Sequence, residues 1–135
     1  VDLSNTYLDW ARRNLALNGF DDPPHRLVRA DCAEWLAAET GQFDLVFLDP
    51  PSFSNSKRME GDFDVQRDHA ALVEQCMARL RPGGQLYFSN NLRSFKLDPA
   101  LGEKFTVEDI SAETIDFDFR RNPRIHRCWR FVQPE

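Results

Sequence analysis

The stretch that decides the fold is residues 43–53, which read FDLVFLDPPSF. Its first half is almost wholly apolar, as is typical of a strand buried on both faces of a parallel sheet. The stretch then ends in Asp49, two prolines, Ser52 and Phe53. Because consecutive prolines cannot donate to a sheet ladder and have a fixed φ, they predict a stiff, extended loop after the strand. Open α/β sheets place their ligand crevice at such strand ends, so this loop is the first candidate for chemistry.

The composition is that of one globular domain with a single core. The chain has 135 residues and a formal net charge of −5, so no chain-wide basic field indicates nucleic-acid binding. Basic residues cluster locally instead, at positions 57–58 and at five arginines between 120 and 130. Three widely spaced cysteines form neither a disulfide framework nor a metal-knuckle spacing, so no metal site is expected. Without a long apolar run or a signal-like start, we expect a soluble cytoplasmic protein.

The hydrophobic spacing alternates between strand and helix along the chain. Helices are predicted at residues 6–17, 33–39, 63–80 and 97–104. Strands are predicted at residues 26–30, 43–48, 85–89, 106–111 and 128–132, with Pro82-Gly83-Gly84 ending the third helix. This alternation predicts an α/β fold with a mostly parallel sheet and right-handed crossovers.

Polar residues follow four of the strand-like segments. Asp2, Asp31 and Asp49 each come at such an end, and Asn90-Asn91 follows a fourth. In a parallel sheet these ends share one edge, so we expect the side chains to converge there, where an acid suits ribose hydroxyls. Each aspartate alone could equally be the N-cap of the next helix.

A glycine-rich nucleotide loop is absent from the start of the sequence. No Gly-x-Gly-x-x-Gly precedes Asp2, and the first glycine of any kind is Gly19. Since such a site needs a glycine turn for close approach of the backbone to the ligand, we expect that the first strand and its loop have been cut away.

Several stretches taken together resemble one family. They are residues 1–5 (VDLSN), 31–32 (DC), 49–59 (DPPSFSNSKRM), 63–69 (FDVQRDH), 88–91 (FSNN) and 122–129 (NPRIHRCW). Over nearly its whole length the chain resembles the C-terminal methyltransferase half of the bifunctional bacterial 23S rRNA (guanine) methyltransferase K/L family. Asp-Pro-Pro alone is shared by many S-adenosylmethionine enzymes, whereas the run 49–59 is far more specific.

The resemblance implies a class I S-adenosylmethionine methyltransferase fold, which is Rossmann-like and mostly parallel with an antiparallel C-terminal strand. The family's strand order is 3-2-1-4-5-7-6. Residues 1–135 would be a single truncated domain running from the end of strand 2 to strand 7. It would lack strand 1 and the glycine loop.

The resemblance also implies the activity, methylation of guanine N7 in 23S rRNA during ribosome biogenesis, and its residues. The cofactor S-adenosylmethionine would be bound by Asp2, Leu3, Ser4, Asp31, Cys32 and Asp49. The catalytic loop would be Asp49, Pro50, Pro51 and Phe53. The phosphates of the rRNA would be held by Lys57, Arg58, Arg120, Arg121 and Arg124.

Several alternatives stay open at this stage. Phe53 either stacks on the target base or packs as a hydrophobic plug under its loop. The arginines either bind RNA or form a solvated loop paired with Asp116 and Asp118. The chain is either part of the guanine-N7 methyltransferase that the resemblance implies or part of another RNA methyltransferase, which acts on cytosine C5 or on an exocyclic amine. A third alternative is a non-catalytic RNA-binding remnant. The related C5 enzymes use a cysteine nucleophile after strand 5, where this chain has Asn90-Asn91. No cysteine of this chain lies there or in the proline loop, which argues against that chemistry.

We therefore predict that the 135-residue polypeptide by itself is unstable or does not bind S-adenosylmethionine, because the glycine turn that would approach the cofactor is missing. Isothermal titration calorimetry of the polypeptide against the cofactor checks this. Tight binding would contradict the prediction.

Overall fold

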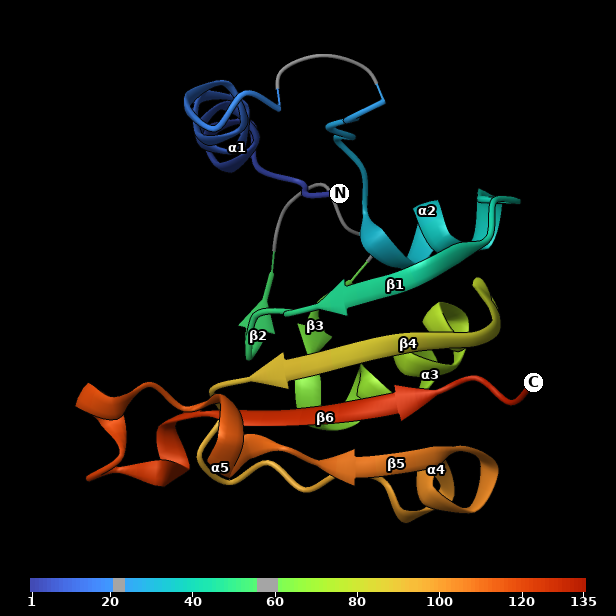
Figure 1. The fold of residues 1–135 in the computed structure, drawn as a ribbon, viewed down its shortest axis with the longest axis vertical. Coiled ribbons are helices and arrows are strands. Elements are labelled where there is room, and N and C mark those ends of the chain that lie inside the picture. The colour runs from blue at the N-terminus through green and yellow to red at the C-terminus, as the bar shows by residue number, and fades with distance from the viewer. Residues whose placement is uncertain (21–23, 56–60) are drawn as a thin grey trace. The chain divides into compact units, whose positions relative to one another are not determined.

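A computed structural model describes residues 1–20, 24–55 and 61–135 of the chain (Figure 1). Lys57 and Arg58, two predicted RNA-binding residues, therefore lie outside the described residues. The chain divides into two compact units, Val1–Glu39 and Thr40–Glu135, and each is described by itself. The expected single domain over 1–135 stays a prediction. No helix among the described residues is both long and apolar enough to cross a lipid bilayer.

The first unit contains two capped helices, α1 (Asn5–Leu17) and α2 (Cys32–Ala38). Ser4 caps α1, and its hydroxyl accepts from the Tyr7 amide at 3.4 Å. The predicted strand at 26–30 is reduced to one parallel bridge, in which Asp2 pairs with Arg29. Asp2 donates to the Val28 carbonyl at 3.0 Å and accepts from the Ala30 amide at 3.2 Å. The parallel direction expected for these two segments is thus observed, although the ladder is only one bridge long.

The second unit is built on a four-stranded sheet. Its strands are β1 (Phe43–Leu48), β4 (Leu80–Asn90), β5 (Thr106–Asp109) and β6 (Arg127–Val132), in the order β1-β4-β6-β5. β1 and β4 are parallel, and β6 is antiparallel to both β4 and β5, so the last strand alone runs against the other three (Figure 1). This confirms the predicted α/β class with an antiparallel C-terminal strand. It is also the 4-5-7-6 part of the order that the resemblance implied.

Short elements complete the second unit. They are the strands β2 (Phe53–Ser54) and β3 (Phe63–Asp64), the helices α3 (Val65–Met77), α4 (Pro99–Lys104) and α5 (Ser111–Thr114), and the 3-10 turns η1 (Phe117–Phe119) and η2 (Pro123–Ile125). The predicted helix 63–80 was too long at its start, because residues 63–64 pair with β2. Sequence spacing did not indicate this hairpin, since two-residue strands have no detectable period.

The start of β4 was also predicted wrongly. The Pro82-Gly83-Gly84 segment lies inside β4, which begins at Leu80 instead of residue 85. The strand accommodates these residues through a register irregularity opposite β1, between Phe43 and Leu45, and Gly83 adopts φ of 73°. A left-handed φ of this kind is open to glycine at little cost, so the segment interrupts the ladder without ending the strand.

One face of the sheet packs on α3 to form the core. The buried side chains of α3 are Val65, His69, Leu72, Val73, Cys76 and Met77. They face fully buried apolar residues of the sheet, among them Leu86, Phe88 and Phe131. His69 belongs to this core, since its ring is stacked on Phe88 at a centroid distance of 6.1 Å and lies edge-on to Phe95 at 4.7 Å. The core thus includes a polar side chain, and its hydrogen bonds bear on the site.

Two glycines of the second unit offer a matched test of the β1–β4 contact. A Cβ at Gly84 would lie 2.9 Å from the Arg81 carbonyl oxygen and 3.2 Å from those of Phe43 and Asp44. Since backbone cannot yield as a flexible side chain does, we expect Gly84→Ala to lower the free energy of unfolding by about 1–3 kcal/mol. Gly102 in α4 has only an ordinary 3.6 Å contact there. Gly102→Ala should therefore raise the free energy of unfolding by about 0.5–1 kcal/mol.

Thermal unfolding of both variants in the whole protein checks this pair. Equal midpoints for the two variants would show that the bulge yields freely and that the close approach is unimportant.

Candidate active site at the carboxyl ends of the strands

The centre of the candidate site is Asp49, held by Ser89. β1 and β4 run in register with Leu48 opposite Phe88, so the next residue of each strand also meets its neighbour. The Ser89 hydroxyl donates to Asp49 Oδ1 at 2.7 Å. Ser89 is buried, whereas Asp49 is exposed. A buried hydroxyl therefore fixes one oxygen of a solvent-facing carboxylate, and a charged acceptor makes this bond stronger than a neutral one.

The proline loop after Asp49 is tied to the start of α3. Pro50 is half-buried and Pro51 is exposed. The Ser52 carbonyl accepts from the Val65 amide at 3.1 Å, and the backbone of Phe53 then pairs with Asp64 across the β2–β3 hairpin. The side chain of Phe53 is 54% exposed. The alternative of a buried plug does not fit this exposure, and the ring is open to an incoming ligand.

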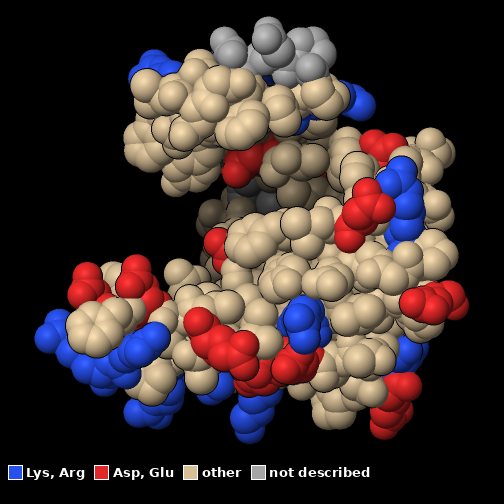
Figure 2. Space-filling view, viewed as in Figure 1, with Lys and Arg blue, Asp and Glu red and all other residues tan. Residues whose placement is uncertain are grey.

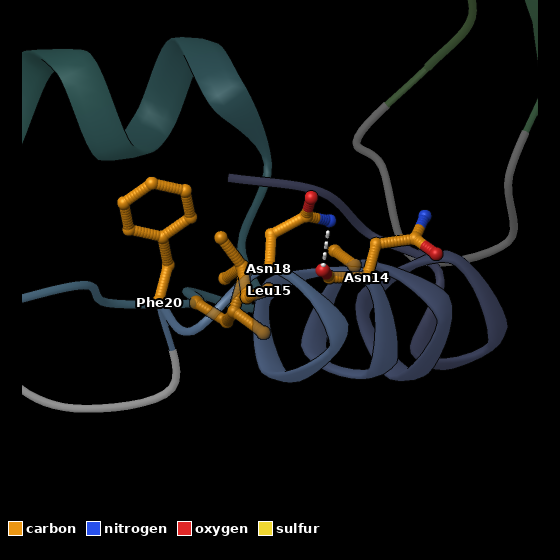
Figure 3. Close-up of a pocket in the computed structure, with 6 residues that line it drawn as sticks. Asn14, Leu15, Asn18 and Phe20 are labelled. Carbon is orange, nitrogen blue, oxygen red and sulfur yellow. Dashed lines mark hydrogen bonds between the residues drawn. The ribbon is translucent and has the colours of Figure 1, made fainter.

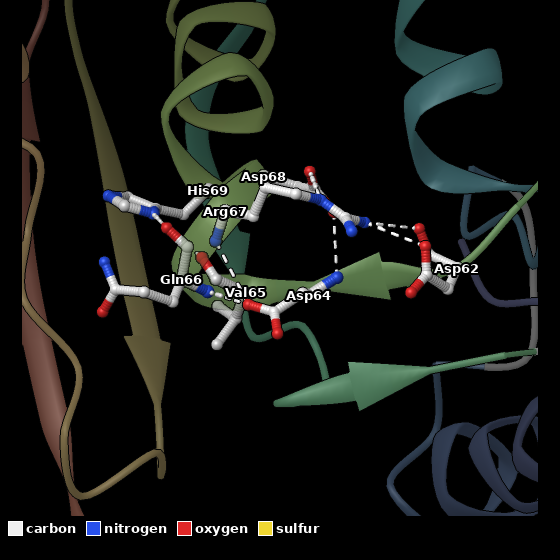
Figure 4. Close-up of polar contacts among 7 residues, drawn as sticks. All are labelled: Asp62, Asp64, Val65, Gln66, Arg67, Asp68 and His69. Atoms are coloured by element: carbon white, nitrogen blue, oxygen red, sulfur yellow. Dashed lines mark hydrogen bonds and ion pairs between the residues drawn. The ribbon is translucent and has the colours of Figure 1, made fainter.

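The first turn of α3 is heavily stabilised (Figure 4). Asp64 Oδ1 accepts from the amides of Gln66 and Arg67 at 2.8 and 3.1 Å, and Asp68 Oδ2 accepts from the Asp64 amide at 2.9 Å. The guanidinium of Arg67 bridges Asp68 and Asp62. Its hydrogen bond lowers the pKa of Asp68, and the two carboxylates raise the pKa of Arg67. The reciprocal bonds at the N-cap fix the turn to which the proline loop is attached.

The same turn of α3 clamps the segment that follows β4. Gln66 Nε2 donates to the Lys96 carbonyl at 2.9 Å, and Gln66 Oε1 accepts from the Lys96 amide at 2.9 Å. His69 Nε2 accepts from the Asp98 amide at 3.0 Å. Since that nitrogen accepts, the hydrogen-bond pattern places the proton on Nδ1, which donates to the Val65 carbonyl at 2.8 Å. Two side chains from one helical turn therefore hold residues 96–98.

A pair of buried donors lies at the end of β4. Asn90 Oδ1 accepts from the Leu92 amide at 3.1 Å, which fixes the orientation of the side-chain amide. Asn90 Nδ2 is buried and has no partner among the described residues. Arg127 lies opposite Asn90 on β6. Its Nε is likewise buried and has no partner among the described residues. The sequence indicates Asn90 only as a strand end, whereas the strand register shows that it lies opposite Arg127.

A cysteine also lies at this edge, which the sequence did not indicate. Cys128 is the β6 partner of Ser89 and is buried. Burial raises the pKa of its thiol, and the negative charges of Asp109 and Asp49 add to that rise, while a bond with Thr114 opposes it. Because the thiolate is the nucleophilic form, this thiol is poorly suited to attack a base. The site therefore gives no support to cytosine-C5 chemistry.

In the first unit, the predicted cofactor residues lie at the ends of the two bridged segments. Asp2 Oδ1 accepts from the Ser4 amide at 2.6 Å, and Leu3 joins the two. Asp31 Oδ1 caps α2 by accepting from the amides of Ala33 and Glu34 at 2.9 and 3.1 Å. Asp31 is thus the N-cap of α2, as the alternative interpretation predicted, but both of these capping bonds go to Oδ1. Among the described residues, Oδ2 of Asp2 and Oδ2 of Asp31 have no hydrogen bond.

Cys32 lies beside these carboxylates at the start of α2. Its thiol faces the Val1 carbonyl at 3.8 Å. Burial raises the pKa of Cys32, and the carboxylates of Asp31 and Asp2 raise it further. The thiol is therefore a neutral, half-buried contact surface. Convergence of Asp2 and Asp31 with Asp49 stays a prediction.

The C-terminal arginines lie in the exposed connection between α5 and β6. Within the described parts of the chain, Arg120, Arg121 and Arg124 take part in no ion pair, and neither do Asp116 and Asp118. The alternative that these arginines are neutralised by the two aspartates is therefore not supported. This connection leads directly into Arg127, which pairs with Asn90. It consequently reaches the same sheet edge as Asp49.

The described residues hold no metal-binding group, and those that line the hollow along α1 carry no reactive side chain. Residues 1–20, 24–55 and 61–135 contain no group of three or more His, Cys, Asp or Glu arranged to hold a metal ion. A hollow of about 460 Å³ lies along α1 in the first unit, lined by Ala11, Asn14, Leu15, Asn18, Phe20 and Leu27 (Figure 3). Among the described residues that line it, the polar side chains are the amides of Asn14 and Asn18, and Asn18 Nδ2 donates to the Asn14 carbonyl at 2.8 Å. None of these described lining residues is titratable, so they offer no acid–base or nucleophilic chemistry.

Comparison with known proteins identifies close relatives. The chain is 65% identical to the "Ribosomal RNA large subunit methyltransferase K/L" of Ectopseudomonas mendocina over 132 residues, and 64% identical to that of Pseudomonas aeruginosa. Each alignment covers 98% of this chain but only 18% of the relative, so the chain spans less than a fifth of their length. No family model matches the sequence.

Solved structures share the fold at low sequence identity. SMU.776, described as a methyltransferase and complexed with SAH, matches with a TM-score of 0.72 and 18% identity over 96% of this chain and 37% of its own. The SAM-dependent methyltransferase from Agrobacterium tumefaciens matches with a TM-score of 0.68 and 15% identity, over 98% of this chain and 47% of its own. The fold is therefore that of the SAM-dependent methyltransferases.

The clamp from α3 gives a prediction about local opening. Gln66→Ala removes two hydrogen bonds to Lys96, each worth about 1 kcal/mol, so we expect the Lys96 amide to exchange its hydrogen at least about tenfold faster. Hydrogen–deuterium exchange on peptides that cover residues 92–98 measures this. Gln75→Ala, on the same helix, is the control and should leave those peptides unchanged. Equal acceleration throughout α3 and the sheet would contradict a local clamp.

Proposed function

Because this chain is homologous to a segment of the ribosomal RNA large subunit methyltransferase K/L proteins, we propose that it carries the residues that methylate guanine N7 in 23S rRNA. The observation that carries this proposal is Asp49, fixed by Ser89 at the carboxyl end of β1 and followed directly by Pro50-Pro51. Open α/β sheets bind their ligands outside these strand ends.

The cofactor of the proposed reaction is S-adenosylmethionine, and the first unit offers groups that fit it. Asp2 and Asp31 each retain a carboxylate oxygen that no described residue engages, and such oxygens accept from ribose hydroxyls or an amino group. Leu3, Ser4 and Cys32 would line the same segments, and Asp49 would face the reacting end. When bound, S-adenosylmethionine supplies an electrophilic methyl group on a positively charged sulfur.

Guanine N7 needs no base for this reaction. It has a lone pair at neutral pH and no proton to lose, so the enzyme has only to position that lone pair and stabilise the positive charge that develops on the purine. The site matches this demand. It presents the carboxylate of Asp49, of which Oδ1 is fixed by the hydroxyl of Ser89.

Within this mechanism, the residues of the proline loop have distinct roles. Asp49 stabilises the developing cation through its charge, while Ser89 keeps its carboxylate in one orientation. Pro50 and Pro51 keep the backbone stiff, so that the loop does not close over the carboxylate. The exposed ring of Phe53 stacks on the cationic purine, an interaction worth about 0.5–2 kcal/mol.

The rRNA would be held by basic side chains around this edge. Arg120, Arg121 and Arg124 are exposed beside it and are available for phosphates. Lys57 and Arg58 follow the proline loop in sequence and are proposed for the same role.

Three other functions remain as competitors. A cytosine-C5 enzyme would need a reactive thiolate, whereas the pKa of the nearest cysteine, Cys128, is raised by burial. An exocyclic-amine enzyme typically has an aromatic residue directly after the two prolines, where this chain has Ser52. A non-catalytic RNA-binding remnant would bind rRNA without needing Asp49.

Two variants of Asp49 test the catalytic proposal. We expect Asp49→Ala to lower the rate of methylation about a hundredfold, as loss of one transition-state contact does elsewhere. Asp49→Asn keeps the acceptor for Ser89 and removes only the charge, so it should lower the rate about tenfold. Asp44→Ala is the matched control, because Asp44 lies on the same strand in an exposed ion pair with Arg81 and should leave the rate unchanged.

Mass spectrometry of rRNA nucleosides, after deletion of the gene and complementation with each variant, provides the readout. Deletion should remove one 7-methylguanosine. Loss of a different nucleoside would refute the N7 assignment, and full methylation by Asp49→Ala would support the RNA-binding remnant.

A further inference from the structure

The connection between α5 and β6 exposes two large aromatic rings. Phe117 and Phe119, both in η1, are 77% and 54% exposed, whereas Ile115 just before them is buried. We call residues 116–126 the aromatic–arginine loop. Two exposed phenylalanines in one short loop form a local apolar surface, and such surface can mark an interaction site.

The arginines of this loop follow the two rings in sequence, and Asp118 lies between Phe117 and Phe119. Arg120 Cζ lies 5.8 Å from the centroid of the Phe117 ring. Residues 116–126 contain three arginines and two aspartates, so their net charge is 3 − 2 = +1 in a chain whose net charge is −5. Figure 2 shows these basic side chains gathered at the lower left, where Figure 1 draws the end of this connection. The loop is therefore a local basic patch that carries aromatic faces.

The shape of the loop is held by its own backbone. The Phe119 amide donates to the Asp116 carbonyl at 3.0 Å, and the Asn122 amide donates to the Phe119 carbonyl at 2.9 Å. The Ile125 amide donates to the Asn122 carbonyl at 3.2 Å. Successive turns therefore display the rings and arginines from a defined backbone, which lowers the ordering cost of binding.

The loop lies at the sheet edge that carries the candidate active site. It ends at Arg127, which pairs with Asn90 at the carboxyl end of β4, next to Ser89 and its partner Asp49. A nucleic acid whose target base reached Asp49 would pass near this loop.

We propose that the aromatic–arginine loop is a stacking platform for unpaired RNA nucleotides next to the target guanine, with Phe117 and Phe119 stacking on bases and Arg120, Arg121 and Arg124 holding phosphates. This proposal rests on the proposed function. It adds that the RNA bound at this site is single-stranded and not duplex. Bases expose their faces only where the strand is unpaired, and exposed aromatic rings close to basic side chains suit that form.

The test is binding of a short single-stranded RNA and of its duplex to the whole protein, measured by fluorescence anisotropy. The double variant Phe117→Leu/Phe119→Leu keeps apolar bulk and removes the ring faces, so it should weaken single-strand binding about tenfold or more and leave duplex binding unchanged. The double variant Phe117→Tyr/Phe119→Tyr keeps the rings and should bind as the unchanged protein does. Phe20→Leu, another exposed phenylalanine, is the matched control.

The arginines are tested by the dependence of binding on salt. The triple variant Arg120→Gln/Arg121→Gln/Arg124→Gln should reduce the slope of log affinity against log salt by about 2, from three phosphate contacts on a single strand. Arg13→Gln on α1 is the charge control. Unchanged single-strand binding by the leucine variant, equal weakening of single-strand and duplex binding, or a change of oligomeric state without RNA would overturn the proposal.

These outcomes are separable from failure of the proposed function. RNA binding is measured without cofactor and without methyl transfer, whereas the nucleoside that is modified is read by mass spectrometry. A protein that makes 7-methylguanosine normally after loss of both rings, with unchanged RNA binding, refutes the platform alone. One that needs the rings to bind but methylates another nucleoside refutes the N7 assignment alone.

Discussion

The candidate site depends on the first turn of α3, because both loops that flank Asp49 are tied to it. Pro50 and Pro51 have no amide hydrogens to donate, so the first loop gains its anchor only at Ser52, whose carbonyl accepts from Val65. The segment after β4 is held by the side chains of Gln66 and His69. Loss of that helical turn would free both loops, whereas the contact between Ser89 and Asp49 requires only that β1 and β4 stay in register.

The sequence predicted the strands with strong hydrophobic runs and missed the features that depend on pairing. β1 was predicted to the residue because residues 43–48 are almost wholly apolar and are followed by Asp49 and two prolines. The expected burial on both faces of the strand is wrong, since Leu45 and Phe47 are 61% and 69% exposed. The Pro-Gly-Gly segment in β4 was misread as a break, because a bulge and a strand end have the same composition and differ only in the partner strand. The positions of Cys128 beside Ser89 and of Arg127 beside Asn90 likewise follow from the β6 register, which no local pattern encodes.

The aspartates at the strand ends show why the capping and ligand-binding alternatives do not exclude each other. Asp31 caps α2 through Oδ1 alone, and Asp2 orients Ser4 through Oδ1 alone. A carboxylate has acceptor sites on both oxygens, so one oxygen can satisfy backbone amides while the other stays available. The bonds to the backbone also fix the direction of the second oxygen. One aspartate at the start of a helix can therefore cap the helix with one oxygen and present the other oxygen, in a fixed direction, to a ligand.

The charge of the chain places a further demand on any RNA site. With a net charge of −5, the chain as a whole repels a polyanion, and the carboxylate of Asp49 adds to that repulsion at the edge where the proposed target base would enter. A local group of unpaired arginines can offset this only over about 10 Å at moderate salt, the distance over which charges are felt. The arginines must therefore lie close to the strand ends. Because β6 is antiparallel to β4, its first residue, Arg127, and the loop that precedes Arg127 lie at the carboxyl end of β4.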